Sequence, residues 1–334
     1  MNSKGKVLLG SRWLLIGGAG FIGSHVLRSF LKSGADCYVF DNLITGQRSR
    51  IPSEVQFILG EATNSNEILK ACEDFEITGI VHLAAFMQAR ESVANPIKFW
   101  SNNLGACLSI ASILELTGVK HIILSSSCSV YGNTPGASEN SPMNPISPYA
   151  MTKVASEQVL AQACEKNSIR LSILRYFNVI GNSNFPESHD HSLETLIPST
   201  VRQVATGSPP SIFGGEFSTP DGSAIRDYLD VRDLASAHET VASSRARDLV
   251  EIMNVSSGKP ISVKTIVDII LGELGSTLVP QIASAKIGDP SAVWSKPSER
   301  LKVLGWVPKY TLNESIRAYC HAHTLTQGNE KGDS

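Results

Sequence analysis

Tyr149 and Lys153 stand four residues apart in the segment SPYAMTK, residues 147–153. On a helix this spacing places both side chains on one face, one turn apart. A free tyrosine is a poor base at neutral pH because its pKa is about 10. We expect the Lys153 ammonium to lower that pKa by favouring the phenolate. The pair is a candidate for proton transfer, although the same spacing also occurs on ordinary helix surfaces.

A glycine-rich segment near the start of the chain predicts a cofactor site. Residues 12–16, RWLLI, suit a buried strand, and GGAGFIGSH follows them at 17–25. A helical pattern continues to about Lys32, and a second strand-like run ends on Asp41. Strand, glycine turn, helix, strand and acid in this order are typical of a dinucleotide-binding unit.

The glycines and the acid have separate tasks in such a unit. Gly17 permits the tight turn, Gly20 lets backbone amides approach a pyrophosphate, and Gly23 lets helix and strand pack closely. Asp41 would accept a hydrogen bond from a ribose 2′-OH and repel a 2′-phosphate. Asn42 follows it, with no adjacent arginine. The segment therefore favours NAD over NADP.

Composition narrows the class of protein. The 334 residues are 42% hydrophobic with a formal net charge of −2, enough for a large core and without the basic excess typical of nucleic-acid or anionic-membrane binding. No apolar run approaches the length of a membrane span. The six cysteines form no metal-ligand spacing and predict reduced thiols in a cytoplasmic protein. We predict no metal site.

The order of elements predicts an α/β fold. Further strand-like runs, at 55–59, 79–83, 121–124 and 171–174, alternate with helical patterns at about 65–74, 95–117 and 149–166. This alternation predicts a Rossmann-type, doubly wound parallel sheet, whose ligands bind beyond the carboxyl ends of the strands. The polar motifs follow the strands at that edge.

Beyond residue 180 the alternation weakens and proline and glycine become denser. We expect an NAD-binding Rossmann domain over 1–180, with 225–256 contributing to it. A smaller C-terminal region over 181–327 would bind the substrate, and 328–334 would form a disordered tail.

Three serines, at 125–127, directly follow the strand-like run at 121–124. The last of them, Ser127, lies 22 residues before Tyr149. A hydroxyl there can bind the same substrate oxygen that a phenolate deprotonates, although serine is also common in turns. With Tyr149 as general base and Lys153 behind it, the implied reaction is oxidation of an alcohol, with hydride passing to a nicotinamide.

These motifs resemble the UDP-glucose (UDP-galactose) 4-epimerases of the extended short-chain dehydrogenase/reductase group. The resemblance covers about residues 12–318 and rests on GGAGFIGSH with its G-x-x-G-x-x-G spacing, SSSCSVYG, SPYAMTK, LRYFNVIG and TPDGSAIRDY. It implies NAD that stays bound through turnover, oxidation at C4 of the sugar, rotation of the 4-keto sugar, and return of hydride to the other face. It also implies a homodimer with an interface of four helices, two of them from 95–117 and 149–166.

The resemblance assigns roles residue by residue. Catalysis would fall to Ser127, Tyr149 and Lys153. NAD would be held by Gly17, Gly20, Phe21, Ile22, Gly23, Asp41, Asn42, Glu61, Ala62, Ala84, Asn103, Lys153 and Phe177. The UDP-sugar would meet Ser127, Tyr149, Asn178, Leu196, Phe213, Arg226, Tyr228 and Lys286, the two cations Arg226 and Lys286 suiting a pyrophosphate.

Five positions depart from the usual family pattern: Glu61 stands for aspartate, Met87 for lysine, Thr195 for asparagine or histidine, Lys286 for arginine and Val293 for tyrosine. Lysine lacks the bidentate geometry of arginine, so UDP binding could be weaker or arranged differently. The smaller Val293 could admit an N-acetyl group at the 2-position of the sugar.

Other functions remain open on the sequence. A UDP-N-acetylhexosamine or UDP-pentose 4-epimerase would share the mechanism. A nucleotide-sugar dehydratase or decarboxylase would need acids directly after the catalytic serine, where this chain has Cys128 and Ser129. A net oxidoreductase would favour NADP, against Asp41. An NAD-binding regulator without catalysis would not need Ser127, Tyr149 and Lys153.

Overall fold

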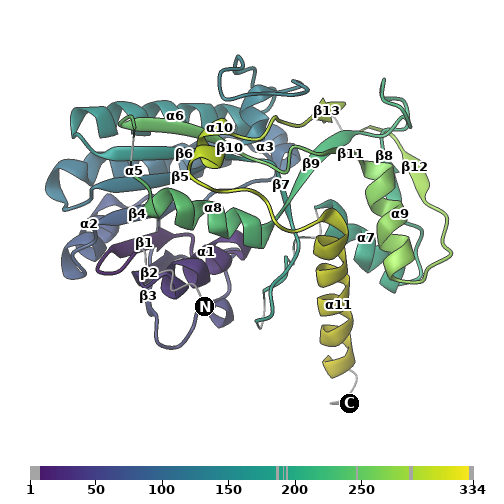
Figure 1. Cartoon of the computed structure of the whole chain (residues 1–334), viewed down its shortest axis with the longest axis horizontal. Helices are drawn as coiled ribbons and strands as arrows, with labels where there is room; N and C mark the ends of the chain where they lie inside the picture. The colour runs from purple at the N-terminus through teal and green to yellow at the C-terminus, as the bar shows by residue number, and fades with distance from the viewer. Residues whose placement is uncertain are drawn as a thin grey trace.

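The main sheet has seven parallel strands with helices on both faces (Figure 1). The computed structural model describes residues 8–185, 188–190, 192, 195–245, 247–285 and 289–330. In spatial order the strands are β10 (Val250–Val255), β6 (Arg170–Tyr176), β5 (His121–Ser127), β4 (Gly79–His82), β1 (Arg12–Ile16), β2 (Asp36–Asp41) and β3 (Gln56–Leu59). The predicted doubly wound α/β fold is confirmed.

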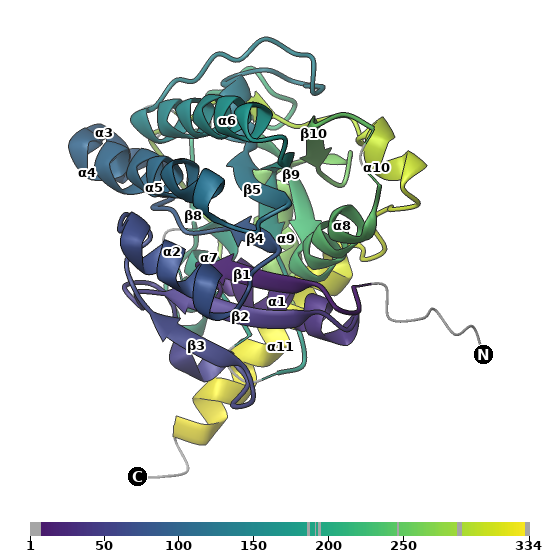
Figure 2. The same ribbon diagram turned by 90° about the vertical axis from the view of Figure 1, so that its left-hand side faces the viewer.

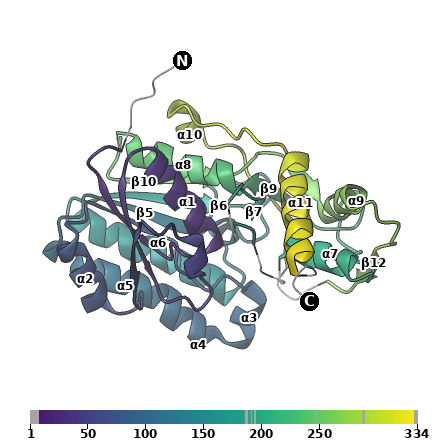
Figure 3. The same ribbon diagram turned by 90° about the horizontal axis from the view of Figure 1, so that it is seen from below.

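Each face of the sheet is covered by its own helices (Figures 2 and 3). One core lies under α1 (Phe21–Lys32) and α8 (Val231–Ser243), and the other under α2 (Ser65–Asp74), α5 (Gly105–Ile113) and α6 (Pro148–Lys166). Neighbouring residues of one strand point to opposite faces. Leu15 and Val81 therefore join the first core, and Leu14 and Ile80 the second.

A smaller part of the molecule lies beyond the carboxyl edge of the main sheet (Figure 1). Its central strand is β9 (Ile225–Asp230), which pairs with β7 (Asn178–Ile180), β11 (Pro260–Ser262) and β13 (Ala292–Val293). Its remaining elements are β8 (Ser211–Phe213), which pairs with β12 (Gln281–Ala283), and the helices α7 (Leu196–Ala205), α9 (Val263–Glu273) and α11 (Leu312–Glu330). The short helix α10 (Glu299–Val303) returns to the main sheet, where Leu301 packs in the core under α1 and α8 and Arg300 Nε donates to Glu251 of β10 at 2.7 Å.

The chain crosses between the two parts more than once. Segment 225–256 supplies β9 to the smaller sheet and β10 to the main one, with α8 packed on α1 between them. The boundary at residue 180 stays a prediction. Helix α11 continues to Glu330, so 328–330 are helical where we expected the start of a tail; residues 331–334 lie outside the described residues.

The helical segment predicted over about 95–117 is confirmed from Pro96 to Leu116, with a π-helical turn inside it, and a short helix before it was not predicted. The structure has α3 (Ala89–Ala94), α4 (Pro96–Phe99), a π-helical turn at Trp100–Leu104 and then α5. Pro96 disfavours helical backbone at the residue before it and starts α4 at its first position, which separates α3 from α4. The π-helical turn carries Asn103, and such turns are frequent at functional sites.

The glycine turn after β1 brings three elements into close contact. Gly17 has φ of 84°, and a Cβ there would lie 2.6 Å from the Ala84 amide nitrogen, just beyond β4. A Cβ at Gly23 would lie 2.3 Å from the Gly17 carbonyl oxygen. The turn lies where β2 continues the sheet on one side of β1 and β4 on the other, which is where doubly wound sheets bind their ligands.

We expect Gly23→Ala to lower the free energy of unfolding by about 1–3 kcal/mol, because the added methyl group meets rigid backbone. Gly272→Ala is the matched control, since it is also helical and its Cβ would meet nothing within 4 Å. That change should stabilise the protein by about 0.5–1 kcal/mol. Urea unfolding measures both, and a stable Gly23→Ala variant would show that the turn has room for a side chain.

Candidate active site

Helix α6 starts where it does because of its first residues. Ser147 is its N-cap and accepts a hydrogen bond from the Ala150 amide at 3.2 Å, and Pro148 occupies the first helical position. The amide of Tyr149, which follows Pro148, donates to Ser92 Oγ of α3 at 3.1 Å. Ser92 is fully buried, so α3 fixes the turn that carries Tyr149.

The end of β5 meets this turn. The Tyr149 phenol is hydrogen-bonded to Ser127. One turn further along α6, Lys153 Nζ donates to the Ser125 carbonyl oxygen at 2.9 Å and lies 6.0 Å from the centre of the Tyr149 ring. The structure thus brings Ser127, Tyr149 and Lys153 together, and the local arrangement suits proton transfer to and from an oxygen at the Ser127 and Tyr149 hydroxyls.

Burial dominates the electrostatics of the pair. It raises the pKa of Tyr149 to about 12, against the hydrogen bond from Ser127, and lowers the pKa of Lys153 to about 8. The expected net lowering of the Tyr149 pKa is wrong for this structure, because burial outweighs the hydrogen bond from Ser127. The phenolate would lose its hydration, and the Lys153 ammonium donates to a carbonyl oxygen of β5.

The glycine turn and the end of β2 form one cradle. Asp41 is only 8% exposed, and its two oxygens accept from the amides of Ala19 at 3.0 Å and Leu43 at 2.9 Å. Asp41 thus holds the turn against β2. A Cβ at Gly20 would meet only the Gly17 carbonyl oxygen, at 3.3 Å, so an anion can approach the first amides of α1, which include those of Phe21, Ile22 and Gly23.

The other residues assigned to NAD lie along the same edge of the sheet. Asn42 Nδ2 donates to Glu61 Oε2 at 3.0 Å, which joins the ends of β2 and β3. Ala84 faces Gly17, as the close approach at that glycine shows. Ala62 packs against the core under α2 and α5. These positions fit an extended dinucleotide that crosses the ends of β1 to β4.

Asn103 and Phe177 are held by the protein itself. Asn103 Nδ2 donates to the Phe86 carbonyl oxygen at 3.0 Å and to Thr152 Oγ1 at 3.2 Å, and its Oδ1 accepts from the Phe86 amide at 2.9 Å. These bonds fix the loop after β4 against α6. Phe177 is buried in a cluster with Val130 and Val293. Direct contact of either residue with NAD stays a prediction.

Most residues assigned to the UDP-sugar gather around β9. Asn178 pairs with Tyr228 across β7 and β9, and the Arg226 guanidinium is paired with Asp289. The charge of Arg226 also reaches the Cys128 thiol next to Ser127, so this group borders the catalytic one. Leu196 packs on the Tyr228 cluster.

Two further assignments stand apart from this group. Phe213 ends β8 and pairs with Ala283 of β12, and Lys286 lies outside the described residues. Their contact with the UDP-sugar therefore stays a prediction.

Comparison with known proteins decides the family. The model of the NAD dependent epimerase/dehydratase family matches residues 13–256. A UDP-glucose 4-epimerase of Lactobacillus helveticus is 33% identical over 303 residues, which cover 89% of this chain and 92% of that protein. The chain belongs to the UDP-glucose 4-epimerase family.

Two solved epimerase structures resemble this chain over 95% of its length. The UDP-glucose 4-epimerase of Bifidobacterium longum, in complex with NAD⁺ and UDP, has a TM-score of 0.87 at 26% identity and covers 95% of this chain and 99% of its own. The UDP-Glc/GlcNAc 4-epimerase of Campylobacter jejuni has a TM-score of 0.79 at 32% identity, and the match covers 95% of this chain and 100% of that protein's chain. The resemblance predicted from the motifs is confirmed.

The structure shows the surroundings of three residues that depart from the epimerase pattern. Met87 is 55% exposed on the loop after β4. Thr195 Oγ1 donates to Asp190 Oδ2 at 3.1 Å, just before α7. Val293 is buried beside Phe177, within a strand whose register places it against Arg226.

Two residues beside this epimerase site were given no catalytic or binding role from the sequence. Ser92 contacts Tyr149 across 57 positions of the chain, and no motif marks it. Ser129 donates its amide to Ser127 Oγ at 3.2 Å. Its own Oγ is buried and has no hydrogen-bond partner in the described part of the chain, which suits a hydroxyl that meets a bound group.

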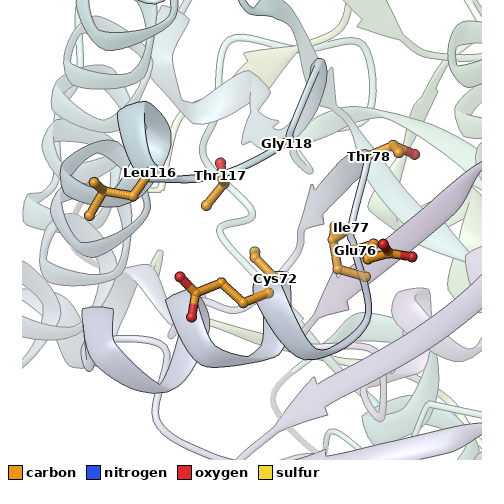
Figure 4. A pocket seen from close by; sticks show the side chains of 8 residues that line it. Cys72, Glu76, Ile77, Thr78, Leu116, Thr117 and Gly118 are labelled. Atoms are coloured by element: carbon orange, nitrogen blue, oxygen red, sulfur yellow. The ribbon is translucent and has the colours of Figure 1, made fainter.

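The pocket in Figure 4 lies elsewhere. It has a volume of about 380 Å³ and is lined by residues that include Cys72, Glu76 and Leu116. Thr78 and Gly118 of its lining precede β4 and β5, so the pocket is at the amino edge of the sheet, opposite the epimerase site.

The residues that the structure describes contain no group of His, Cys, Asp and Glu suited to a metal ion. They also contain no helix with the length and apolar character that a membrane crossing requires.

We expect Asp41→Asn to weaken retention of NAD, since the amide cannot accept from both Ala19 and Leu43 without turning a donor toward one of them. Asp36→Asn is the control, because Asp36 is exposed at the other end of β2. Chromatography of nucleotide released on denaturation measures the bound fraction. Equal NAD content in the two variants would remove Asp41 from the cradle.

Proposed function

We propose that the chain catalyses NAD-dependent 4-epimerisation of a UDP-sugar, with UDP-glucose and UDP-galactose as the pair interconverted. The observation that carries the proposal is the Ser127–Tyr149 hydrogen bond, which lies above the buried Lys153 at the same sheet edge as the glycine turn. Family membership and the NAD and UDP bound by the Bifidobacterium longum relative support it.

In this mechanism Tyr149 moves one proton in each direction. Bound NAD⁺ supplies the hydride acceptor and a positive charge. Ser127 donates a hydrogen bond to the sugar 4-oxygen while Tyr149 Oη takes its proton, the C4–H bond breaks with its electron pair, and a 4-keto group forms. After the sugar turns, hydride returns to C4 from the other face, and Tyr149 gives the proton back. Net oxidation is zero, so Tyr149 acts first as base and then as acid.

The buried site explains why a cation must lie close to Tyr149. With a pKa of about 12, the phenol holds its proton at neutral pH, and nearby positive charge shifts it toward phenolate. Lys153, with a pKa of about 8, carries that charge at neutral pH. Arg226 lies on the UDP side, where a pyrophosphate would compete with Asp289 for the guanidinium.

A second candidate substrate is a UDP-N-acetylhexosamine. Val293 is smaller than the tyrosine that some members of the family have at this position, and the Campylobacter jejuni relative is a UDP-Glc/GlcNAc 4-epimerase. A lyase reaction is disfavoured, because the residue after Ser127 is Cys128, and burial raises the pKa of this thiol to about 12.

A panel of UDP-sugars tests the proposal. The protein, without added cofactor, is incubated separately with UDP-glucose, UDP-N-acetylglucosamine and UDP-xylose, and the products are separated by chromatography. We expect UDP-galactose from the first. No turnover of UDP-N-acetylglucosamine would reject the role given to Val293, epimerisation of UDP-xylose alone would change the sugar, and a deoxy-keto product would replace the epimerase with a lyase.

Tyr149→Phe should lower kcat by about 10²–10⁴-fold, because the proton acceptor is removed, while UDP binding measured by calorimetry stays intact. Tyr38→Phe is the control. Tyr38 is in β2 and stacks on Phe75, and β2 is separated from β5, the strand that carries Ser127, by β1 and β4. Turnover near wild type in Tyr149→Phe would exclude the phenol as the base.

We also propose a cytoplasmic homodimer. None of the six cysteines is in a disulfide, as expected in a reducing compartment. Helices α3 to α6 carry large exposed apolar side chains, namely Val93, Ile97, Leu108 and Met151, and α3, α4 and α5 all contact α6 (Figure 2). Such a surface suits a second copy of the chain.

Ile97→Glu should produce monomers, because a charge would be buried in this interface. Val279→Glu is the control: Val279 is 77% exposed, close to the 74% of Ile97, but lies in the smaller part of the molecule. Light scattering after size-exclusion chromatography measures the mass. A dimeric Ile97→Glu variant would place the interface elsewhere, and a monomeric wild type would refute the dimer.

A further inference from the structure

A buried carboxylate lies directly behind the catalytic residues. Glu157 is on α6, four residues after Lys153 and eight after Tyr149, so the three side chains share one helix face. It is only 4% exposed. Carboxylates are almost never this buried unless they are paired, and no catalytic step above uses Glu157.

Glu157 joins α6 to two strands at once. Its Oε1 accepts from Ser126 Oγ of β5 and from Arg175 Nε of β6 at 3.0 Å, and its Oε2 accepts from Arg175 Nη2 at 2.6 Å. Ser126 and Arg175 are cross-strand neighbours in the sheet. The carboxylate therefore fixes the position of the ends of β5 and β6 along the axis of α6.

Each of the three serines that end β5 contacts one residue of the same helix face. Ser127 is hydrogen-bonded to Tyr149, the Ser125 carbonyl accepts from Lys153, and Ser126 donates to Glu157. A shift of β5 against α6 would break all three contacts together. Two of them are catalytic, and the third is held by the strongest ionic contact of the group, a bidentate Arg–carboxylate pair.

Arg175 is anchored on its far side as well. Its Nη1 donates to Tyr131 Oη at 2.8 Å, and Tyr131 donates to Asn254 Oδ1 of β10 at 2.7 Å. Arg175 is 2% exposed, so it cannot follow Glu157 into solvent. Tyr131 follows Ser127 by four residues, and the network thus fixes both sides of the strand end.

The charge of Glu157 also acts on Lys153. The groups that face the ammonium are the Cys107 thiol of α5, His82 of β4 and Glu157. Burial keeps His82 neutral by lowering its pKa to about 3 and raises the pKa of the Cys107 thiol. Near neutral pH, Glu157 is therefore the charged member of this set, and its charge raises the pKa of Lys153 against the effect of burial.

We propose that Glu157 is a positioning residue for the reaction: it locks the end of β5 onto α6 and holds a negative charge beside Lys153. The inference rests on the proposed epimerase function. It assigns a task to a residue that touches neither sugar nor cofactor.

The test is the pH dependence of kcat for Glu157→Gln in the full-length protein. We expect kcat to fall about 10- to 100-fold as the alignment of Ser127 with Tyr149 loosens. The wild-type rate should decline above a pH near 8, where Lys153 loses its proton. In the variant this decline should start at lower pH, because Lys153 has lost its neighbouring anion while Arg175 remains.

A measurement without turnover checks the same point. The ¹³Cε signal of Lys153, assigned with Lys153→Met, reports its titration in the protein as purified. Its midpoint should lie near 8 in the wild type and lower in Glu157→Gln. An unchanged midpoint would remove the electrostatic part of the proposal.

Two single variants separate alignment from charge. Ser126→Ala keeps both charges and loses the contact with β5, so kcat should fall while the alkaline decline stays in place. Tyr131→Phe removes one far partner of Arg175, which keeps Glu139 and Met143, so it should lower kcat less than Ser126→Ala and leave the alkaline decline in place. Wild-type kcat in Ser126→Ala would remove the alignment part of the proposal.

A double variant covers the case in which Glu157→Gln does not fold. In Glu157→Leu/Arg175→Met, apolar groups replace the whole buried ion pair, which often preserves stability. A purely structural role predicts wild-type kcat and pH profile in this variant, and that result would overturn the proposal. Wild-type protein without any epimerase activity would instead refute the proposed function.

Discussion

The site depends on the junction between the end of β5 and the first three turns of α6. Ser127 is on a strand and Tyr149 is on a helix. The two hydroxyls can act on the same oxygen only if the strand and the helix keep a fixed position relative to each other. Serines are useful at this strand end because a small side chain with a hydroxyl lets the helix approach and still supplies polar contacts. Ser92 and Ser147 add support from outside, since both accept hydrogen bonds from amides of the first turn of α6.

Burial is the second constraint, and it acts on the two catalytic groups in opposite directions. Excluding water raises the pKa of the Tyr149 phenol and lowers that of the Lys153 ammonium, so the neutral form of each is favoured. Charges brought by ligands or by neighbouring side chains therefore have large effects here, because little water screens them. A site of this kind suits a reaction in which a proton leaves one oxygen and later returns to it.

The predictable part of the fold came from periodicity and glycine spacing. Buried parallel strands read as apolar runs, and Gly17 and Gly23 are required by backbone contacts that no other residue permits, so sheet and cradle followed from local sequence. The helix at 95–117 followed from its apolar pattern, but that pattern runs through the π-helical turn without marking it and gives no signal for α3. Contacts such as Ser92 with Tyr149 and Arg226 with Asp289 join distant segments, and no local pattern encodes them.

The two halves of the site are joined by one continuous piece of chain. β9 carries Arg226 and Tyr228 in the smaller sheet, α8 then packs on the glycine-turn helix α1, and β10 closes the main sheet beside β6. Asp227, between Arg226 and Tyr228, is fully buried and accepts from the amides of Ser257 and Gly258 just after β10. A displacement of β9 would therefore also displace the end of β10, which pairs with β6, the strand that carries Arg175. The backbone that we propose binds the nucleotide thus also supports the network behind Tyr149, and together they would hold the sugar and the phenol in fixed relative positions during turnover.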